Sequence, residues 1–441
     1  MTTFDEKYVF TSKAKRNLAI IFAVGVVLLL VGIFMNMGNG GHEEEQHAAN
    51  QVTEQLLAST TDVQHEEAAA TEHHVTQPWL KRLYTNLWIN NMFFVGLGVI
   101  GVFFFALQYA ASAFWSTGML RVSMAMGNWL PYSFLLILGV FFFAKQDLFH
   151  WTHEYLYDTN SPLYDSIIDG KKAYLNLPFF IGRMVVFIGG WYLFFLYMRR
   201  NALAEDIEVG GIARWTKIRT TSAWFLIFFA VSSSMSAWDW VLSIDTHWFS
   251  TMFGWYVFSS WWVSGLAFIT FIIIILKEQG YLSIVNSNHL HDLVKFIFGF
   301  SIFWTYLWFS QFLLIYYANI PEESVYFVQR LTTPQYRPIF FINLLINFVF
   351  PFLALMSRDS KRQMSILKSV TVVVMLGHWL DFYLMITPGV MKFDGGFGFM
   401  EIGSAMIFLA AFVWVVLSSL AKYPLIAKNH PTLQESLHHH I

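Results

Sequence analysis

Ten long apolar runs are the feature that most limits what this chain can fold into. A bilayer hydrocarbon core about 30 Å thick needs about 20 apolar residues per helix, with every backbone polar group bonded inside the helix. Ten segments of the 441-residue chain meet this requirement. They run approximately over 17–37, 87–115, 131–151, 177–198, 222–242, 254–275, 296–317, 338–356, 367–386 and 401–420. The sequence therefore predicts an all-α integral membrane protein with ten transmembrane helices.

Composition excludes several classes of protein. Only 13% of the residues are charged, against roughly 25% in a soluble domain. The net charge of −2 favours neither nucleic acid nor acidic substrates as partners. Because the chain has no cysteine, disulfides, iron–sulfur ligation and covalent haem attachment all fall to partner chains. With one deeply placed histidine, His378, a membrane haem is disfavoured, and a phosphate loop of the P-loop type is absent.

The basic residues predict the orientation, because cytoplasmic loops retain an excess of lysine and arginine. Of the 27 such residues, 18 lie on the side of the N-terminus, eight lie on the opposite side, and Arg183 lies within a span. Both termini are therefore expected in the cytoplasm. The acidic, His-rich segment 38–86 is expected to be a solvated loop on the outer side, with weak metal binding less favoured. The histidine run 438–440 stays unassigned.

Two pairs of similar segments indicate an internal repeat. Residues 177–181 open the fourth span much as 337–342 open the eighth, and 237–240 resemble 379–382. We expect two four-helix bundles, spans two to five and spans six to nine, flanked by spans one and ten. The corresponding divisions are 1–37, the loop 38–86, the bundles 87–242 and 243–388, and the last span with the C-terminus, 389–441. Counted from the predicted starts of their spans, Asp239 and Asp381 are expected at similar depth, toward the outer leaflet.

Ionisable side chains inside a span are costly and are functional candidates by default. The candidates for proton transfer or a quinone site are Asp239, Arg183, His150, His378 and Asp381, joined by Asp245 and His247 after the fifth span. The first five are expected to converge at one level, and Asp239, Ser243 and His247, spaced four apart, are expected to share a helical face. An Arg183–Asp239 pair and a His378–Asp381 pair could equally hold helices together. No metal site and no catalytic residue is predicted.

Two chemistries suit this set of residues. Quinol oxidation releases two protons and needs groups that hydrogen-bond the ring oxygens, and histidine with aspartate is a suitable acceptor and relay pair. The same side chains could also carry protons with no quinone present. The residues alone leave both open, together with a secondary transporter built on the repeat and a structural scaffold for peripheral cytochromes.

The stretch 236–256, SAWDWVLSIDTHWFSTMFGWY, resembles the ActF subunits of bacterial alternative complex III, members of the NrfD-like (polysulfide-reductase membrane subunit) family. The likeness extends by topology over about 84–420. It implies a multi-pass subunit of a quinol:cytochrome c oxidoreductase in the bacterial inner membrane, contributing to proton translocation and a candidate for quinone binding. Asp239, Asp245 and His247 lie in the matching stretch.

The same resemblance implies the partners. They are a sister NrfD-like subunit, which is the better candidate for quinol oxidation, multihaem and monohaem cytochromes c, an iron–sulfur subunit, membrane lipids and a terminal oxidase. Haems and iron–sulfur clusters are expected in those partners, in agreement with the missing cysteines. No redox centre and no covalently bound cofactor is expected in this chain.

Overall fold

The structure, a computed structural model, describes residues 6–38, 76–207 and 212–439. Most of the predicted acidic loop, 39–75, and His440 lie outside the described residues. The described residues form α-helices, short 3-10 turns and one π-helical segment, and they include no β-strand. Ten helical segments are long and apolar enough to cross a membrane. The chain is therefore a multi-pass, all-helical membrane protein.

The helices follow one another along the chain with short connections. Their bounds are α1 Ser12–Gly38, α3 Pro78–Ala110, α4 Leu120–Met126, α5 Leu130–Leu148, α6 Ser166–Gly170, α7 Leu177–Glu205, α8 Ile212–Trp240, α9 Phe253–Glu278, α10 Ser287–Ala318, α11 Pro321–Thr332, α12 Arg337–Leu344, η7 Leu345–Val349, α13 Phe350–Ala354, α14 Met364–Met391, α15 Phe399–Leu420 and α16 Leu433–Leu437. The segment α12–η7–α13 makes up the eighth span.

Several helices are longer than their apolar runs. α3 begins at Pro78, inside the segment predicted as loop, and α8 begins at Ile212, ahead of the apolar run that starts at Ser222. Polar first turns can stay helical because the backbone bonds of the helix do not depend on an apolar surface. Hydropathy alone therefore placed these starts too late.

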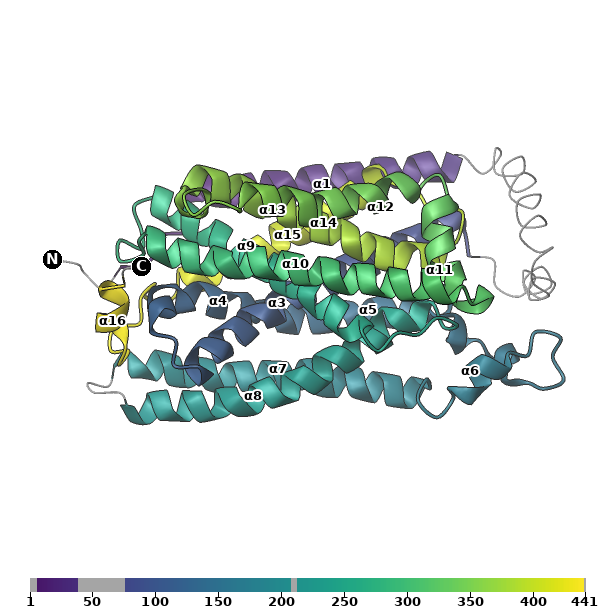
Figure 1. The fold of residues 1–441 in the computed structure, drawn as a ribbon, viewed down its shortest axis with the longest axis horizontal. Helices are drawn as coiled ribbons and strands as arrows, with labels where there is room; N and C mark the ends of the chain where they lie inside the picture. The colour runs from purple at the N-terminus through teal and green to yellow at the C-terminus, as the bar shows by residue number, and fades with distance from the viewer. Residues whose placement is uncertain (1–5, 39–75, 208–211, 440–441) are drawn as a thin grey trace.

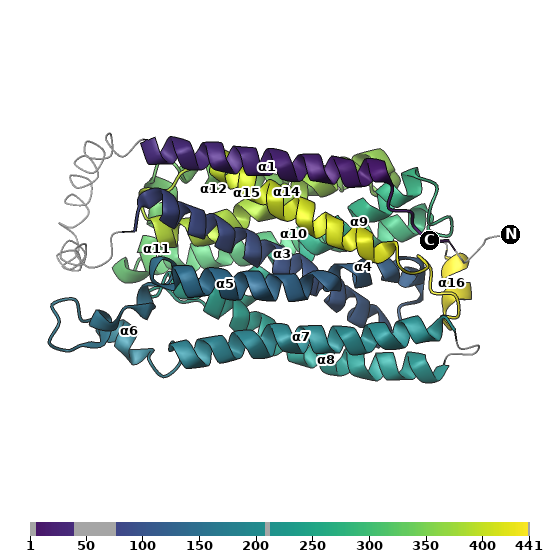
Figure 2. The same cartoon turned by 180° about the vertical axis from the view of Figure 1, so that it is seen from behind.

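The helices lie side by side with α1 along one edge and the α7–α8 pair along the opposite edge (Figures 1 and 2). α3 and α9 form the centre and are buried along almost their whole length, whereas α1 is mostly exposed. α3 contacts α5, α8, α9, α14 and α15, and α9 contacts α8, α10 and α14. The start of α1 and the C-terminal helix α16 lie at the same end of the molecule (Figure 1).

Glycines allow the closest helix contacts. At the α1–α15 contact, a Cβ added to Gly403 would lie 2.5 Å from the Leu29 nitrogen and 2.7 Å from the Gly25 oxygen. At the α3–α9 contact, Gly96 faces the ring of Trp261, whose Nε1 donates to the Met92 carbonyl at 3.0 Å. Without a hydrophobic force between helices in lipid, such close packing is what holds spans together.

Proline makes the eighth span irregular. Pro351 has no N–H to give to the carbonyl of Asn347, four residues earlier. Just before it, residues Leu345–Val349 adopt a π-helical turn, in which the N–H of Phe350 bonds the Leu345 carbonyl five residues back. Such π-turns occur mostly as single distortions of α-helices, often at functional sites. Here the turn carries Asn347 directly after Asn343, and both side chains are buried.

Candidate functional site

Arg183 and Asp239 form a buried, two-pronged ion pair. Nε and Nη2 of Arg183 donate to the two Asp239 carboxylate oxygens at 2.6 and 3.0 Å, and Nη1 donates to the Tyr174 carbonyl at 3.1 Å. The guanidinium lies between the rings of Tyr174 and Phe179, 4.0 and 4.1 Å from their centres. Asp239 is fully buried. Neither charge can be removed without leaving the other unpaired in a dry interior, so this pair ties α7 to α8.

Asp381 is also fully buried, but four neutral groups surround it instead of a cation. Ser260 and Trp304 Nε1 each donate to one carboxylate oxygen at 2.9 Å. Asn343 donates to the other at 2.9 Å, and the Tyr256 hydroxyl also donates to it. These donors come from α9, α10 and α12, so three helices converge on one side chain of α14. A proton bound here leaves no partner charge unpaired, which distinguishes Asp381 from Asp239.

His378 lies one helical turn before Asp381 and reaches it through a shared hydroxyl. Ser260 Oγ is 2.9 Å from His378 Nδ1 and 2.9 Å from the Asp381 carboxylate. The hydroxyl has a single proton and gives it to the carboxylate, so His378 Nδ1 must carry its own hydrogen and donate. His378 Nε2 is then an acceptor, and this atom is buried with no hydrogen-bond partner among the described residues. The sequence-predicted pair is therefore linked by a serine that the sequence analysis missed.

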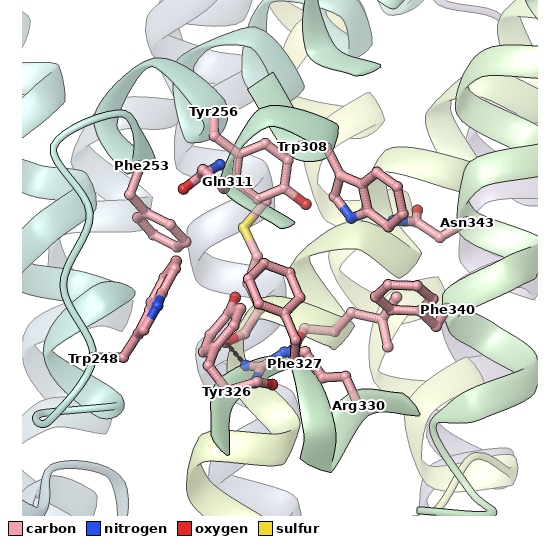
Figure 3. Close-up of a pocket in the computed structure, with 12 residues that line it drawn as sticks. Trp248, Phe253, Tyr256, Trp308, Gln311, Tyr326, Phe327, Arg330, Phe340 and Asn343 are labelled. Carbon is pink, nitrogen blue, oxygen red and sulfur yellow. Dashed lines mark hydrogen bonds between the residues drawn. The ribbon is translucent and has the colours of Figure 1, made fainter. Parts of the chain in front are cut away.

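A small cavity borders the donors of Asp381. Its volume is about 20 Å³, and its lining includes Tyr256, Asn343, Gln311 and Arg330 among aromatic side chains (Figure 3). That space holds a water molecule, which needs at least about 10–15 Å³ and two to four polar partners. It is far below the roughly 300–1,000 Å³ of a typical small-molecule pocket. In this conformation the cavity suits water and not a quinone ring.

Arg330, on α11, closes the other side of the cavity. Its Nη2 donates to Asp245 at 3.1 Å and to the Met385 carbonyl at 3.2 Å. Its Nη1 donates to the Tyr326 carbonyl at 2.7 Å, and the guanidinium lies 3.4 Å from the centre of the Tyr326 ring. Both Arg330 and the Asp245 carboxylate are largely buried. The predicted residue Asp245 is therefore half of an ion pair whose other half is a loop-helix arginine.

A proline explains why an arginine is needed there. Pro388 interrupts α14 and has no N–H for the Leu384 carbonyl four residues earlier. Arg330 Nε donates to that carbonyl at 2.9 Å, and the neighbouring Gln329 donates to the Pro388 carbonyl at 3.1 Å. A buried carbonyl without a partner would be costly. The signal that could have pointed to Arg330 is thus Pro388 inside an apolar span.

His247 and His150 lie outside the spans and away from the Asp381 cluster. His247 is 45% exposed and donates through Nε2 to Asp165 at 2.5 Å. Burial opposes ionisation of Asp165, but hydrogen bonds from the Ile168 N–H and from His247 outweigh it and lower the pKa of this carboxyl. The expected shared face of Asp239, Ser243 and His247 is wrong, because α8 ends at Trp240.

His150 begins a separate 3-10 turn, His150–Thr152, after α5 ends at Leu148. Packed protein atoms and the cation of Lys392 lower its pKa, although the side chain keeps an exposed face. Among the described residues its ring forms no ion pair; the neighbouring ring of His153 lies 5.8 Å away, centre to centre. No group of three metal-binding side chains occurs within the described part of the chain.

The candidates do not all meet. Asp239 is the penultimate residue of α8, whereas ten residues follow Asp381 before α14 ends at Met391. Ten residues of helix correspond to about 15 Å, so the similar register predicted for the two carboxylates is wrong. No hydrogen bond or ion pair joins them in the parts of the chain that the structure describes. The site is therefore the Asp381 cluster with its cavity and the Arg330–Asp245 pair, and Arg183–Asp239 is a separate fastening.

No family model matches this sequence, and no curated protein is significantly similar to it.

Proposed function

We propose that the chain is a membrane subunit of a bacterial respiratory quinol:cytochrome c oxidoreductase of the alternative complex III type, in which it transfers protons. The observation that carries the proton-transfer part is Asp381, a buried carboxylate held by four neutral donors beside a cavity that fits water. The respiratory part rests on the likeness of residues 236–256 to the ActF subunits.

The proposed path has two arms that meet at Asp381. On one side, Tyr256 and Asn343 connect the carboxylate to the water-sized cavity, and Arg330 connects the cavity to Asp245, which is partly exposed. A water in the cavity could exchange a proton with Asp381 through the Tyr256 hydroxyl.

On the other side, the hydroxyl of Ser260 links Asp381 to His378, whose Nε2 has a free lone pair. Asn347, which donates to Asn343 at 2.6 Å, also has a buried oxygen without a partner. These two unpartnered acceptors are the points at which a further water or proton donor would join the path.

Quinone binding takes second place in this proposal. A cavity of about 20 Å³ has no room for a quinone ring, and the lone cation near it, Arg330, already bonds three carbonyls and a carboxylate. A quinone would have to bind at the surface or at a contact with a partner. Quinol oxidation is therefore assigned to the sister subunit, which the resemblance also favours.

The proposal includes an arrangement and an orientation. α3, α5, α7 and α8 would form one four-helix bundle, and α9, α10, α12–α13 and α14 a second, with α1 and α15 beside them; the contacts α3–α5, α5–α7, α7–α8, α9–α10 and α9–α14 are compatible with it. The excess of basic residues on the side of the termini favours cytoplasmic termini in a bacterial inner membrane. Asp245 would then face the periplasm and mark the proton exit.

Partners supply the redox centres in this account. A sister NrfD-like subunit, cytochromes c and an iron–sulfur subunit would hold the haems and clusters, since this chain has no cysteine to bind them. Copurification tests that assignment: gentle solubilisation through an affinity tag on this chain should yield c-type haem absorbance. A colourless chain that purifies by itself would contradict it.

A secondary transporter is the alternative that copurification also tests. Transporters built on repeats commonly carry broken helices at corresponding positions of the two halves. Here the eighth span is irregular at η7, whereas its counterpart α7 runs without interruption through Gly189 and Gly190. The asymmetry favours the respiratory subunit over the transporter.

A further inference from the structure

An open apolar groove lies between α7 and α8, on the edge of the molecule opposite α1 (Figures 1 and 2). Its volume is about 720 Å³, and its walls include Leu193 and Tyr197 from α7 and Trp224 and Phe228 from α8. The helices approach most closely beside it, where a Cβ added to Gly190 would lie 2.6 Å from the Phe228 ring. The groove is therefore a built hollow in the lipid-facing surface.

Two cations extend the walls of the groove by one helical turn. Arg200 follows Leu193 by seven residues and Tyr197 by three, and Lys217 precedes Thr221 by four and Trp224 by seven. These spacings put each cation on the same helical stripe as the groove residues. Both side chains are exposed, and neither forms an ion pair within the described residues. The groove thus has an apolar body and a doubly cationic mouth, at the end of the molecule where α16 lies.

We propose that this groove is a binding site for an anionic phospholipid, independent of the respiratory role. An acyl chain lies along Leu193 and Trp224, and the phosphate is held between Arg200 and Lys217. Seven residues of helix separate Leu193 from Arg200, about 10 Å, so the headgroup and part of the chain engage one continuous surface. Basic pockets between spans are typical sites for anionic headgroups. Two unpaired cations favour this occupant over a zwitterionic lipid, which brings its own ammonium, and over an apolar helix.

The missing cysteines make a site-specific test possible. The full chain carrying Leu193→Cys receives one fluorescent label in the groove, and a second protein carrying Phe143→Cys receives it on the exposed face of α5. Each is reconstituted into phosphatidylcholine vesicles, and phosphatidylglycerol or phosphatidylcholine with brominated acyl chains is added at equal fractions to quench the label. Arg200→Ala with Lys217→Ala removes the mouth. Lys13→Ala with Arg16→Ala removes the same charge at the start of α1.

The Leu193 label should show an apparent association with brominated phosphatidylglycerol at least about fivefold stronger than with brominated phosphatidylcholine, a factor expected of one well-placed cation. The Arg200→Ala, Lys217→Ala protein should lose this preference, and the Lys13→Ala, Arg16→Ala protein should keep it. The Phe143 label should show no preference. Equal quenching of the Leu193 label by both lipids would overturn the proposal. So would no quenching by either lipid while the Phe143 label is quenched, which would indicate a protein in the groove.

Discussion

The guanidinium of Arg330 donates its Nε–H to the backbone carbonyl of Leu384 at 2.9 Å. That carbonyl lies four residues before Pro388, which has no N–H to offer it. A side chain of the surface helix α11 thus completes a span in which proline removes a helix bond, and it also holds Asp245 at 3.1 Å.

Removal of Arg330 should be strongly destabilising. Arg330→Ala leaves Asp245 without its cation and the Leu384 carbonyl without a donor, so we expect a loss of about 3–5 kcal/mol in the free energy of unfolding. Arg330→Lys should recover only part, because an ammonium cannot reach all four acceptors. Thermal unfolding of the purified chain in detergent measures both, with the exposed Arg219→Ala as control. An Arg330→Ala protein as stable as the control would contradict this role.

The two buried aspartates should respond differently to the same substitution. Asp239→Asn strands the Arg183 guanidinium in a dry site, and we expect a loss of about 3–5 kcal/mol. Asp381→Asn strands no charge, and the new amide can donate to the Tyr256 oxygen while its carbonyl accepts from Trp304, so a loss of about 1 kcal/mol is expected. Unfolding in detergent compares the two proteins directly. Equal losses would mean that both carboxylates are structural.

The Asp165–His247 contact predicts a local dependence on pH. Because the pKa of Asp165 is lowered from its ordinary value of 3.8, the contact stabilises the fold above that value and loses its contribution as the pH falls through the lowered pKa. Between about pH 5 and pH 3, protease cleavage near α6 should therefore rise. Asp165→Asn should be cleaved readily at both pH values, and Asp158→Asn, in the preceding turn, should behave like the unsubstituted chain. A flat profile in the unsubstituted chain would count against the contact.

Gly403 should be the least replaceable glycine on α15. A Cβ there would meet Leu29 and Gly25 of α1, so Gly403→Ala should cost about 1–3 kcal/mol by overpacking. At Gly182, on α7, no atom lies within 4 Å of an added Cβ. Gly182→Ala should therefore be neutral or slightly stabilising, and unfolding in detergent gives both values. A neutral Gly403→Ala would show that α1 packs elsewhere.

The spans could be predicted from the sequence because a bilayer imposes helix length and apolarity on each of them. Ten predicted spans match ten helical segments of the structure. The Arg183–Asp239 pair was foreseeable as well, since two opposite charges inside spans have few other partners. The starts of α3 and α8 were not, because polar turns outside the apolar run leave no hydropathy signal.

The donors around Asp381 could not be predicted. Tyr256, Ser260, Trp304 and Asn343 are ordinary residues of apolar spans, and only helix rotation decides whether they face one carboxylate or lipid. Arg330 was hidden for another reason: it lies in a segment read as loop, and its role depends on a carbonyl that Pro388 leaves open. Prolines inside spans, Pro351 and Pro388, are the sequence signals nearest to the site.

The most direct test of proton transfer through Asp381 is the number of protons translocated per electron by the purified complex in sealed vesicles, driven by quinol and cytochrome c. We predict that Asp381→Asn lowers this number while electron transfer to cytochrome c continues, and that Asp169→Asn, on the loop helix α6, leaves it unchanged. An Asp381→Asn complex that translocates as many protons per electron as the unsubstituted one would contradict the account.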